Sequence, residues 1–402
     1  MKGFMYSVVA SGLHDAASID RILAPVAAEL ELLGGRRMTG DEFERHTPHV
    51  IVVATGGTEQ AILDLVARRH TAEPWEPVVL VAHPLHNSLP ASLEALARLR
   101  GDGVAGRIVQ VSEPGEPATT IADLAVIHRF QHTRLGLIGE PSDWLVASVP
   151  HRKSFEAQWG IELVDVDVGE AIRHHPDAPD VEVHEVAVKF SGSGEPDLET
   201  VAAAAMYPTL TRVIEAHRLD AVAVRCFDFI TDLHTSGCVA LAELNDRGVV
   251  AGCEGDIAST VAMLLVRELL DRPSWIANPA RIDVDSGHML LAHCTVAPSM
   301  VDDLELHTHF ESGLGIGLRG TFAPGPVTLL RLGGDRLERH WFAEGQIEAS
   351  GDAPDLCRTQ VTVHVDEPLD ALLDDPLGNH VVMALGHHRA RLERWWRLAF
   401  PA

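Results

Sequence analysis

The sequence has few basic residues and few aromatic ones. Among its 402 residues, 32 are Lys or Arg and 58 are Asp or Glu, which gives a formal net charge of −26, and 5% are aromatic. This charge repels nucleic acid and anionic lipid, and no Lys/Arg-rich run offers a local exception. We therefore expect no nucleic-acid partner. The lack of a basic cluster also indicates no phosphate site, which favours a neutral substrate.

Long apolar runs and closely spaced cysteine pairs are absent as well. No stretch reaches the ~18 apolar residues of a membrane-spanning helix, and the first apolar segment is too short for a secretory leader. The sequence contains five cysteines without CxxC spacing, which predicts reduced thiols rather than disulfides or a zinc knuckle. We expect a cytoplasmic protein without a membrane segment.

What the sequence does contain is ordinary globular composition, with 46% hydrophobic and 22% charged residues. Its length suggests two or three domains at ~100–200 residues each. Residues 1–150 alternate short apolar runs, such as Val50–Ala54 and Val78–Ala82, with helical segments, which is typical of a doubly wound parallel sheet. The glycine-containing loop at 55–58 is either a tight turn or an anion site at a helix N-terminus.

The pattern changes twice further along the chain. Residues 151–300 form a second alternating section, in which Val249–Gly252 reads as a strand and Ile257–Leu270 as an apolar helix. In residues 301–402 the pattern changes again: Thr308–Val365 consists of short alternating apolar and polar stretches interrupted by glycines, and a terminal helix is expected at Ala384–Phe400. The sequence therefore predicts two α/β domains with doubly wound parallel sheets, followed by an antiparallel β-rich, barrel-like C-terminal domain.

The segment Cys253–Asp256 holds two acids between an apolar strand and a helix. Ligands and catalytic groups collect at the C-terminal edge of an open parallel sheet, where this segment belongs. Asp256 is also well placed to be an ordinary helix N-cap. Glu254, which is closer to the strand, is harder to explain as a cap.

Two histidines follow or precede apolar, strand-like runs. His293 ends Met289–His293, and His380 precedes Val381–Met383. Each is either a hydrogen-bonded core residue or a metal ligand. Together with a glutamate they would suit Mn, Mg or Zn.

With these residues in view, the region 219–390 resembles the C-terminal half of the L-fucose isomerase and L-arabinose isomerase family. Four features carry the resemblance: the strand–acid–helix segment Cys253–Asp256; Trp275–Asn278; the strand ending His293–Cys294 before a glycine-rich β-domain; and the late Gly378–His380. Their order and spacing match the family together, although no one motif is specific alone. Residues 1–218 fit the family's α/β domains only in general pattern.

The resemblance implies a divalent metal, usually Mn²⁺, that binds two adjacent oxygens of an open-chain sugar. Glu254 matches the acidic ligand that also serves as acid and base, with Asp256 in support. His380 matches the late histidine ligand, and His293 a histidine used by the arabinose isomerases. The resemblance also implies a homo-oligomer, a trimer or a hexamer.

The second acidic ligand of the family falls on Asn278, where the fucose isomerases have aspartate. Asparagine still offers a carbonyl oxygen to a metal but cannot take a proton. A shifted alignment would place Asp283 or Asp285 there instead. If Asn278 holds the position, Glu254 has to move the proton alone.

Two further residues are candidates for substrate binding. Asp228 follows an apolar strand at the same predicted sheet edge and is either a hydrogen-bond partner of a sugar hydroxyl or a cap. Trp144 offers an apolar face either to a sugar ring or to the protein core.

These observations predict a metal-dependent isomerase that interconverts an aldose and a ketose through an ene-diol, with a small-molecule sugar as substrate. Two alternatives stay open. One is a sugar-binding or regulatory protein that kept the fold and lost turnover, and the other is a metal-dependent enzyme of another reaction on a sugar acid or polyol.

Overall fold

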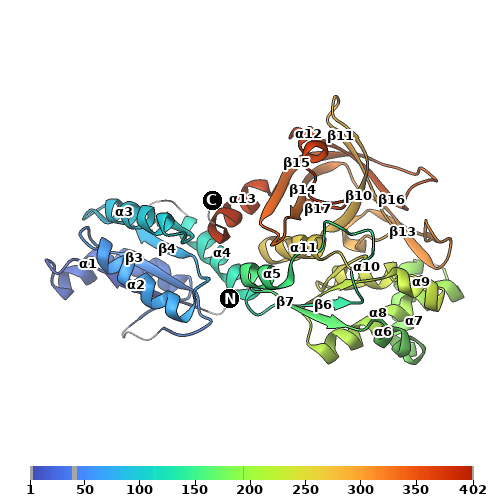
Figure 1. Cartoon of the computed structure of the whole chain (residues 1–402), viewed down its shortest axis with the longest axis horizontal. Helices are drawn as coiled ribbons and strands as arrows, with labels where there is room; N and C mark the ends of the chain where they lie inside the picture. The colour runs from blue at the N-terminus through green and yellow to red at the C-terminus, as the bar shows by residue number, and fades with distance from the viewer. Residues whose placement is uncertain (1–2, 39–42, 112, 114, 193, 401–402) are drawn as a thin grey trace. The chain divides into compact units, whose positions relative to one another are not determined.

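A computed structural model describes residues 3–38, 43–111, 113, 115–192 and 194–400 (Figure 1). The chain divides into two compact units. Unit 1 consists of Met1–Gln131 and Glu393–Ala402, and unit 2 of His132–Leu392.

Unit 1 is built on a five-stranded parallel sheet in the order β2-β1-β3-β4-β5. Every residue of β3 and β4 is buried, because helices cover both faces of such a sheet and the strands become continuous apolar runs. The strands are β1 (Phe4–Val9), β2 (Gly35–Arg37), β3 (His49–Val53), β4 (Val78–Ala82) and β5 (Gly106–Gln110). The helices are α1 (Ala16–Leu32), α2 (Glu59–Ala72), α3 (Ser88–Gly101) and α4 (Glu116–Phe130).

The end of helix α13 (Arg389–Ala399) also belongs to unit 1. Arg394 donates to the carboxylate of Glu116 at 2.5 Å and to the hydroxyl of Thr120 at 2.8 Å. The ring of Trp395, which is 1% exposed, meets that of Phe130 edge-on at 5.8 Å. A segment from the end of the sequence thus forms part of the core around α4.

A buried histidine lies in the middle of this sheet. His49 is 4% exposed, and its Nε2 lies 2.9 Å from the hydroxyl of Ser7. Burial lowers the pKa of His49 to about 4, and the charge of Arg69 adds to this while that of Glu76 opposes it. The imidazole is therefore neutral at pH 7.

Because His49 is buried and neutral, we predict that the free energy of unfolding of unit 1 decreases in mild acid. A histidine with an unfolded pKa of ~6.5 and a lower folded pKa stabilises the fold above pH ~6.5, and this contribution is lost as the pH falls toward 4. From pH 7.5 to 5.0 we expect a loss of about 2 kcal/mol in the free energy of unfolding. A urea titration at each pH, monitored by hydrogen exchange of peptides from β1 and β3, would measure this loss.

The control is His49→Gln, which keeps a polar group near Ser7 but does not titrate. We expect its stability to depend less on pH over that interval. If the free energy of unfolding of the variant changes with pH as steeply as that of the wild type, His49 is not the group that causes the loss of stability.

Unit 2 opens with a four-stranded parallel sheet in the order β7-β6-β8-β9. The strands are β6 (Arg134–Ile138), β7 (Glu162–Val166), β8 (Ala221–Val224) and β9 (Val250–Gly252). The helices are α5 (Arg152–Trp159), α6 (Val168–His174), α7 (Asp180–Ser191), α8 (Leu198–His217), α9 (Phe227–Leu233), α10 (Cys238–Asp246) and α11 (Ile257–Leu270), with a short 3₁₀ turn η1 (His175–Asp177).

A closed antiparallel barrel follows, drawn from yellow-orange to red in Figure 1. Its order is β10-β11-β16-β15-β14-β17, and alternate residues of its strands fill a shared apolar core. The strands are β10 (Trp275–Asp283), β11 (His288–His293), β14 (Gly325–Gly333), β15 (Arg339–Ser350), β16 (Thr359–Val365) and β17 (Val381–Leu385). The remaining elements are the β12 (Asp303–Thr308) and β13 (Ile316–Thr321) pair, the turn η2 (Pro298–Met300) and helix α12 (Asp370–Asp374).

The predicted fold class is confirmed: two parallel α/β sheets precede an antiparallel barrel. The terminal helix begins later than expected, because Ala384 and Leu385 belong to β17, which is paired on both sides in the barrel. The barrel itself begins at Trp275, before the glycine-rich stretch that drew attention to it. Helix α7 was not expected from the sequence.

The five cysteines are all free thiols in the structure, as predicted. Among the described residues, no helix is both long enough and apolar enough to span a bilayer.

Candidate metal centre

Glu254 sits in a sharp turn between β9 and α11. Its backbone has φ 63° and that of Gly255 has φ 70°, so two successive residues are left-handed. A non-glycine residue in this region is strained, and such strain is common at functional sites. A Cβ on Gly255 would lie 2.9 Å from the Cα of Pro141, so glycine is needed there for close approach as well. The turn thus presents the Glu254 side chain at the carboxyl edge of the sheet.

The barrel brings together two histidines that are distant in the sequence. His293 is the last residue of β11, and His380 comes directly before β17. Strand β10 lies between these two strands and pairs with both, with Asn278 opposite Ala292 and Ala277 opposite Val381. Strand β11 pairs with the second half of β10 and β17 with the first half, so the end of β11 and the start of β17 meet beside Ala277 and Asn278.

Glu254, His293 and His380 form one buried group. One ligand atom from each lies within 4.8 Å of the others. Oε1 of Glu254 is 3.6 Å from Nε2 of His293 and 3.5 Å from Nε2 of His380. These distances exceed those of ordinary hydrogen bonds. They are close to the ~3.4 Å expected between two ligand atoms that each lie ~2.1 Å from a tetrahedral metal.

One unpartnered atom also fits a metal ion. Nε2 of His380, which lies beside Glu254, is buried and has no hydrogen-bond partner. Nδ1 of His380 lies 2.8 Å from Oδ2 of Asp256, so it carries the proton and leaves the Nε2 lone pair toward Glu254. A carboxylate that holds a histidine in this way is the usual outer partner of a metal ligand. The residues present therefore fit a divalent metal.

The electrostatics of the group agree with this. Burial opposes the charge of Glu254, but His293 and His380 outweigh burial and hold the pKa of Glu254 below its usual range. Burial likewise lowers the pKa of His380, but Asp256 and Glu254 prevail and raise it to about 9. Without a metal, His380 is thus protonated at pH 7. A bound cation would replace that proton.

Asp256 serves as the N-cap of α11 and as the partner of His380. It accepts from the Ser259 amide at 2.8 Å and is fully buried. Arg331, which is 1% exposed, places NH1 3.3 Å from Oδ2 of Asp256 and 2.8 Å from Oγ of Ser259. Burial raises the pKa of Asp256, but His380 and Arg331 hold it at about 2. The sequence predicted Asp256 as a cap. It did not predict the ion pair with Arg331, which lies 75 residues away in β14.

Aromatic residues line one side of the group. Nε1 of Trp144 donates to Oε2 of Glu254 at 2.6 Å, and the Trp144 side chain is half exposed. The Phe227 ring meets both the Trp144 ring, at 5.1 Å, and the His309 ring, at 5.4 Å. Burial lowers the pKa of His309 to about 4, with a further contribution from His293, so its ring is neutral at pH 7. Phe227 and His309 carried no sequence signal, since neither lies in a motif.

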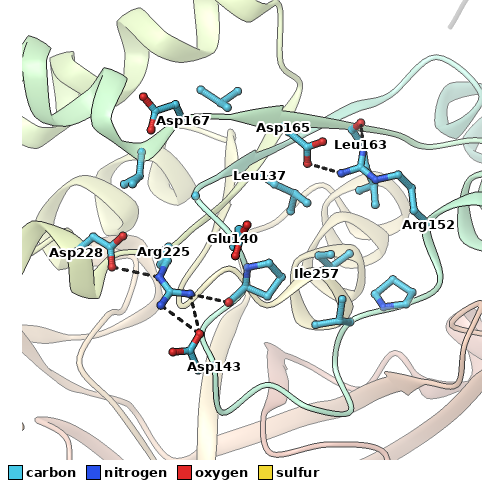
Figure 2. A pocket seen from close by; sticks show the side chains of 16 residues that line it. Leu137, Glu140, Asp143, Arg152, Leu163, Asp165, Asp167, Arg225, Asp228 and Ile257 are labelled. Atoms are coloured by element: carbon cyan, nitrogen blue, oxygen red, sulfur yellow. Dashed lines mark hydrogen bonds and ion pairs between the residues drawn. The ribbon is translucent and has the colours of Figure 1, made fainter.

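Asp228 is placed elsewhere, in a separate cavity of about 770 Å³ at the carboxyl edge of the parallel sheet. Figure 2 shows Arg225 between Asp228 and Asp143, with Nε of Arg225 3.2 Å from Oδ1 of Asp228. Neither Glu254 nor either histidine lines this cavity. The structure thus brings Trp144 to the Glu254 group and leaves Asp228 in an ion pair outside it.

Asn278 is partly buried in β10, and its backbone lies between Ala292 and the start of β17. It therefore adjoins both histidine-bearing strands. Asp283, one of the two alternative acids, is at the far end of the same strand, where it pairs with His288. Asp285 lies beyond β10 in the turn that follows. This distance along β10 favours Asn278 over either aspartate as the residue next to the histidines.

Comparison with known proteins finds no matching family model. The chain is similar to the sulfoquinovose isomerases of Priestia aryabhattai and Priestia megaterium, each 26% identical over 178 residues, which cover 42% of this chain and 40% of the relative. It is also 28% identical over 93 residues to the sulfoquinovose isomerase of a Clostridium species, over 23% of this chain and 21% of the relative. The chain thus spans less than half the length of these relatives. The similarity indicates distant homology to a sugar isomerase, and the Glu254, His293 and His380 group could bind a metal ion.

Proposed function

We propose that the protein is a metal-dependent isomerase that interconverts an aldose and a ketose through an ene-diol. The observation that carries this proposal is the buried Glu254, His293 and His380 group, with its metal-like spacing and the unpartnered Nε2 of His380. The distant homology to sulfoquinovose isomerases supports the reaction type. We propose Mn²⁺ as the metal, in keeping with the resemblance to the fucose and arabinose isomerases.

A bound metal would act as a Lewis acid toward two adjacent oxygens of the sugar. Glu254 takes the proton from one carbon and returns it to the next, while Trp144 holds its second oxygen by the indole N–H. Asp256 is fully buried, so it does not touch the sugar, and it acts by fixing the tautomer of His380.

The remaining predicted residues have supporting roles in this proposal. Asn278, beside both histidine strands, is a neutral ligand or an orienting group. The exposed face of Trp144 contacts the sugar, and Asp228 binds a hydroxyl only if the substrate extends toward the neighbouring cavity. Sulfoquinovose, the sugar that appears in the names of the relatives, is the first substrate to test. We further propose a cytoplasmic homo-oligomer, either a trimer or a hexamer.

The test is to load the protein with Mn²⁺ in D₂O and follow a panel of aldoses, sugar acids and polyols by NMR. We expect conversion of one aldose into its ketose, with deuterium entering at the carbon next to the carbonyl, because the shuttled proton exchanges with solvent. A product that is not an isomer would favour a different metal-dependent enzyme. No conversion of any sugar would contradict the proposal.

Asn278 favours a second candidate, a sugar-binding homologue without turnover. An asparagine at this position removes a group that could take a proton. If the protein only binds sugar, Asn278→Asp is expected to create or raise isomerase activity. In a working enzyme the same change is expected to lower activity or alter the metal preference.

A further inference from the structure

Arg225, the residue that follows β8, binds a loop that begins at the end of the neighbouring strand β6. We call residues 139–145 the Trp144 loop. NH1 of Arg225 donates to the carbonyl oxygen of Pro141 at 2.8 Å, which is a charge-assisted hydrogen bond to the backbone of this loop. Gly139 has φ 83°, and a Cβ there would lie 2.8 Å from the Cβ of Arg225, so the loop needs glycine to start this close to the arginine.

Two carboxylates contact the guanidinium of Arg225. Its Nε lies 3.2 Å from Oδ1 of Asp228, and both of its terminal nitrogens lie 3.3 Å from Oδ1 of Asp143 (Figure 2). The Asp228 side chain is 31% exposed, whereas that of Asp143 is 88% exposed. Because ion pairs at exposed positions contribute little, Asp228 is the carboxylate that orients Arg225.

The Trp144 loop is also bound to the turn that carries Glu254. The amide of Ser142 donates to the carbonyl oxygen of Glu254 at 2.9 Å, and Nε1 of Trp144 donates to its Oε2 at 2.6 Å. The other carboxylate oxygen, Oε1, is the one that lies 3.6 Å from His293 and 3.5 Å from His380. The indole N–H therefore fixes how the carboxylate is turned, with one oxygen toward the histidines and the other toward Trp144.

Packing holds only part of this loop. Leu145 is buried and anchors its end, whereas Asp143 and Trp144 are exposed. The Trp144 ring packs edge-on against that of Phe227 at 5.1 Å. A segment with this little burial depends on its hydrogen bonds to keep one position. The bond from Arg225 therefore fixes the part of the loop that precedes Trp144.

We propose that Arg225 is a positioning residue, which holds the Trp144 loop so that the indole N–H stays on Oε2 of Glu254. This inference rests on the proposed isomerase function, in which Glu254 moves the proton, and it names a residue outside the metal group on which that step depends. Without Arg225 the loop and the carboxylate would be free to move. A displacement of ~1 Å at a reacting group can cost about 100-fold in rate.

The first test follows the indole N–H itself, by NMR of protein in which the tryptophans are labelled with ¹⁵N. The chain has seven tryptophans, and the indole signal that is missing from Trp144→Phe is that of Trp144. Arg225→Met is expected to shift or broaden this signal, because the indole is no longer held on the carboxylate. The measurement needs neither metal nor sugar, so its result does not depend on turnover.

The matched control is Arg152→Met. Arg152 lines the same cavity as Arg225 and also binds a carbonyl and a carboxylate, but these belong to Leu163, at 2.7 Å, and Asp165 on β7 rather than to the Trp144 loop. We expect it to leave the Trp144 signal unchanged. Asp228→Asn keeps the arginine and removes its orienting charge, so a smaller shift is expected, and this variant replaces Arg225→Met should that one not fold.

The second test is a double-mutant cycle on turnover, with the sugar that the wild type converts. Arg225→Met alone is expected to lower kcat and kcat/KM together by about 10- to 100-fold. In Trp144→Phe, which already lacks the indole N–H, the same substitution is expected to lower kcat by less than about threefold, because the two residues act through one contact. An arginine that only stabilised the fold would lower kcat equally in both backgrounds.

Two results would overturn this assignment: a Trp144 indole signal that neither Arg225→Met nor Asp228→Asn alters, or equal losses of kcat in the two backgrounds. The isomerase proposal fails separately, if the wild type converts no sugar. In that case the NMR measurement still decides whether Arg225 holds Trp144 on Glu254.

Discussion

Glu254→Gln is expected to fold normally and to lose both the metal and the activity. Glutamine keeps an oxygen for the Trp144 N–H but carries no charge, and it cannot accept a proton. The loss of a charged ligand is expected to weaken metal binding by at least about 100-fold, since even outer partners of metal ligands contribute ~10- to 100-fold. Loss of the proton shuttle is expected to remove a further ~10²–10⁴-fold from the turnover rate.

Metal content per chain after Mn²⁺ loading, together with competition against a chelator, would measure the first effect. The matched control is Glu140→Gln, because Glu140 is an exposed glutamate that lines the separate cavity. We expect the control to retain its metal. A Glu254→Gln protein that also retains one metal ion per chain would place the ion elsewhere and would end the proposed role of Glu254.

Asp256→Asn is expected to have the largest effect on stability. Arg331 is almost fully buried, and Asp256 is the carboxylate paired with it. Leaving one member of a buried ion pair without its partner costs about 3–5 kcal/mol. The His380 proton would also lose its charged acceptor, so metal affinity is expected to fall by ~10- to 100-fold.

Asp197→Asn is the control for this variant. Asp197 caps α8 by accepting from the Thr200 amide at 2.8 Å, as Asp256 caps α11, but it has no buried arginine beside it. Asn and Asp are about equally good caps, so we expect little change in urea unfolding. If both substitutions cost the same, the ion pair with Arg331 does not stabilise the protein.

The sequence allowed the parallel sheets and the Glu254 turn to be predicted, because both depend on local patterns. An apolar strand followed by acids and a helix can be read from adjacent residues, and in the structure Glu254 and Asp256 lie at that junction. The histidines could be selected only through resemblance, since 23 histidines are spread over the chain.

What could not be predicted depends on closure of the barrel. Strands β10 and β17 pair across about a hundred residues of sequence, and no periodicity reveals which strands become neighbours. Arg331 and His309 reach the site only through the folding of the barrel and the turns attached to it. In the sequence each looks like an ordinary polar residue in or beside a β-strand. Neither composition nor spacing therefore identifies it as a site residue.

The assignment of Glu393–Ala402 to unit 1 has a consequence for how the chain comes to be folded. During synthesis the first 131 residues leave the ribosome long before Arg394 and Trp395, which bind and pack against α4. The surface of α4 that these residues cover therefore stays exposed while all of unit 2 is made. Unit 1 is therefore completed only after unit 2 has been made.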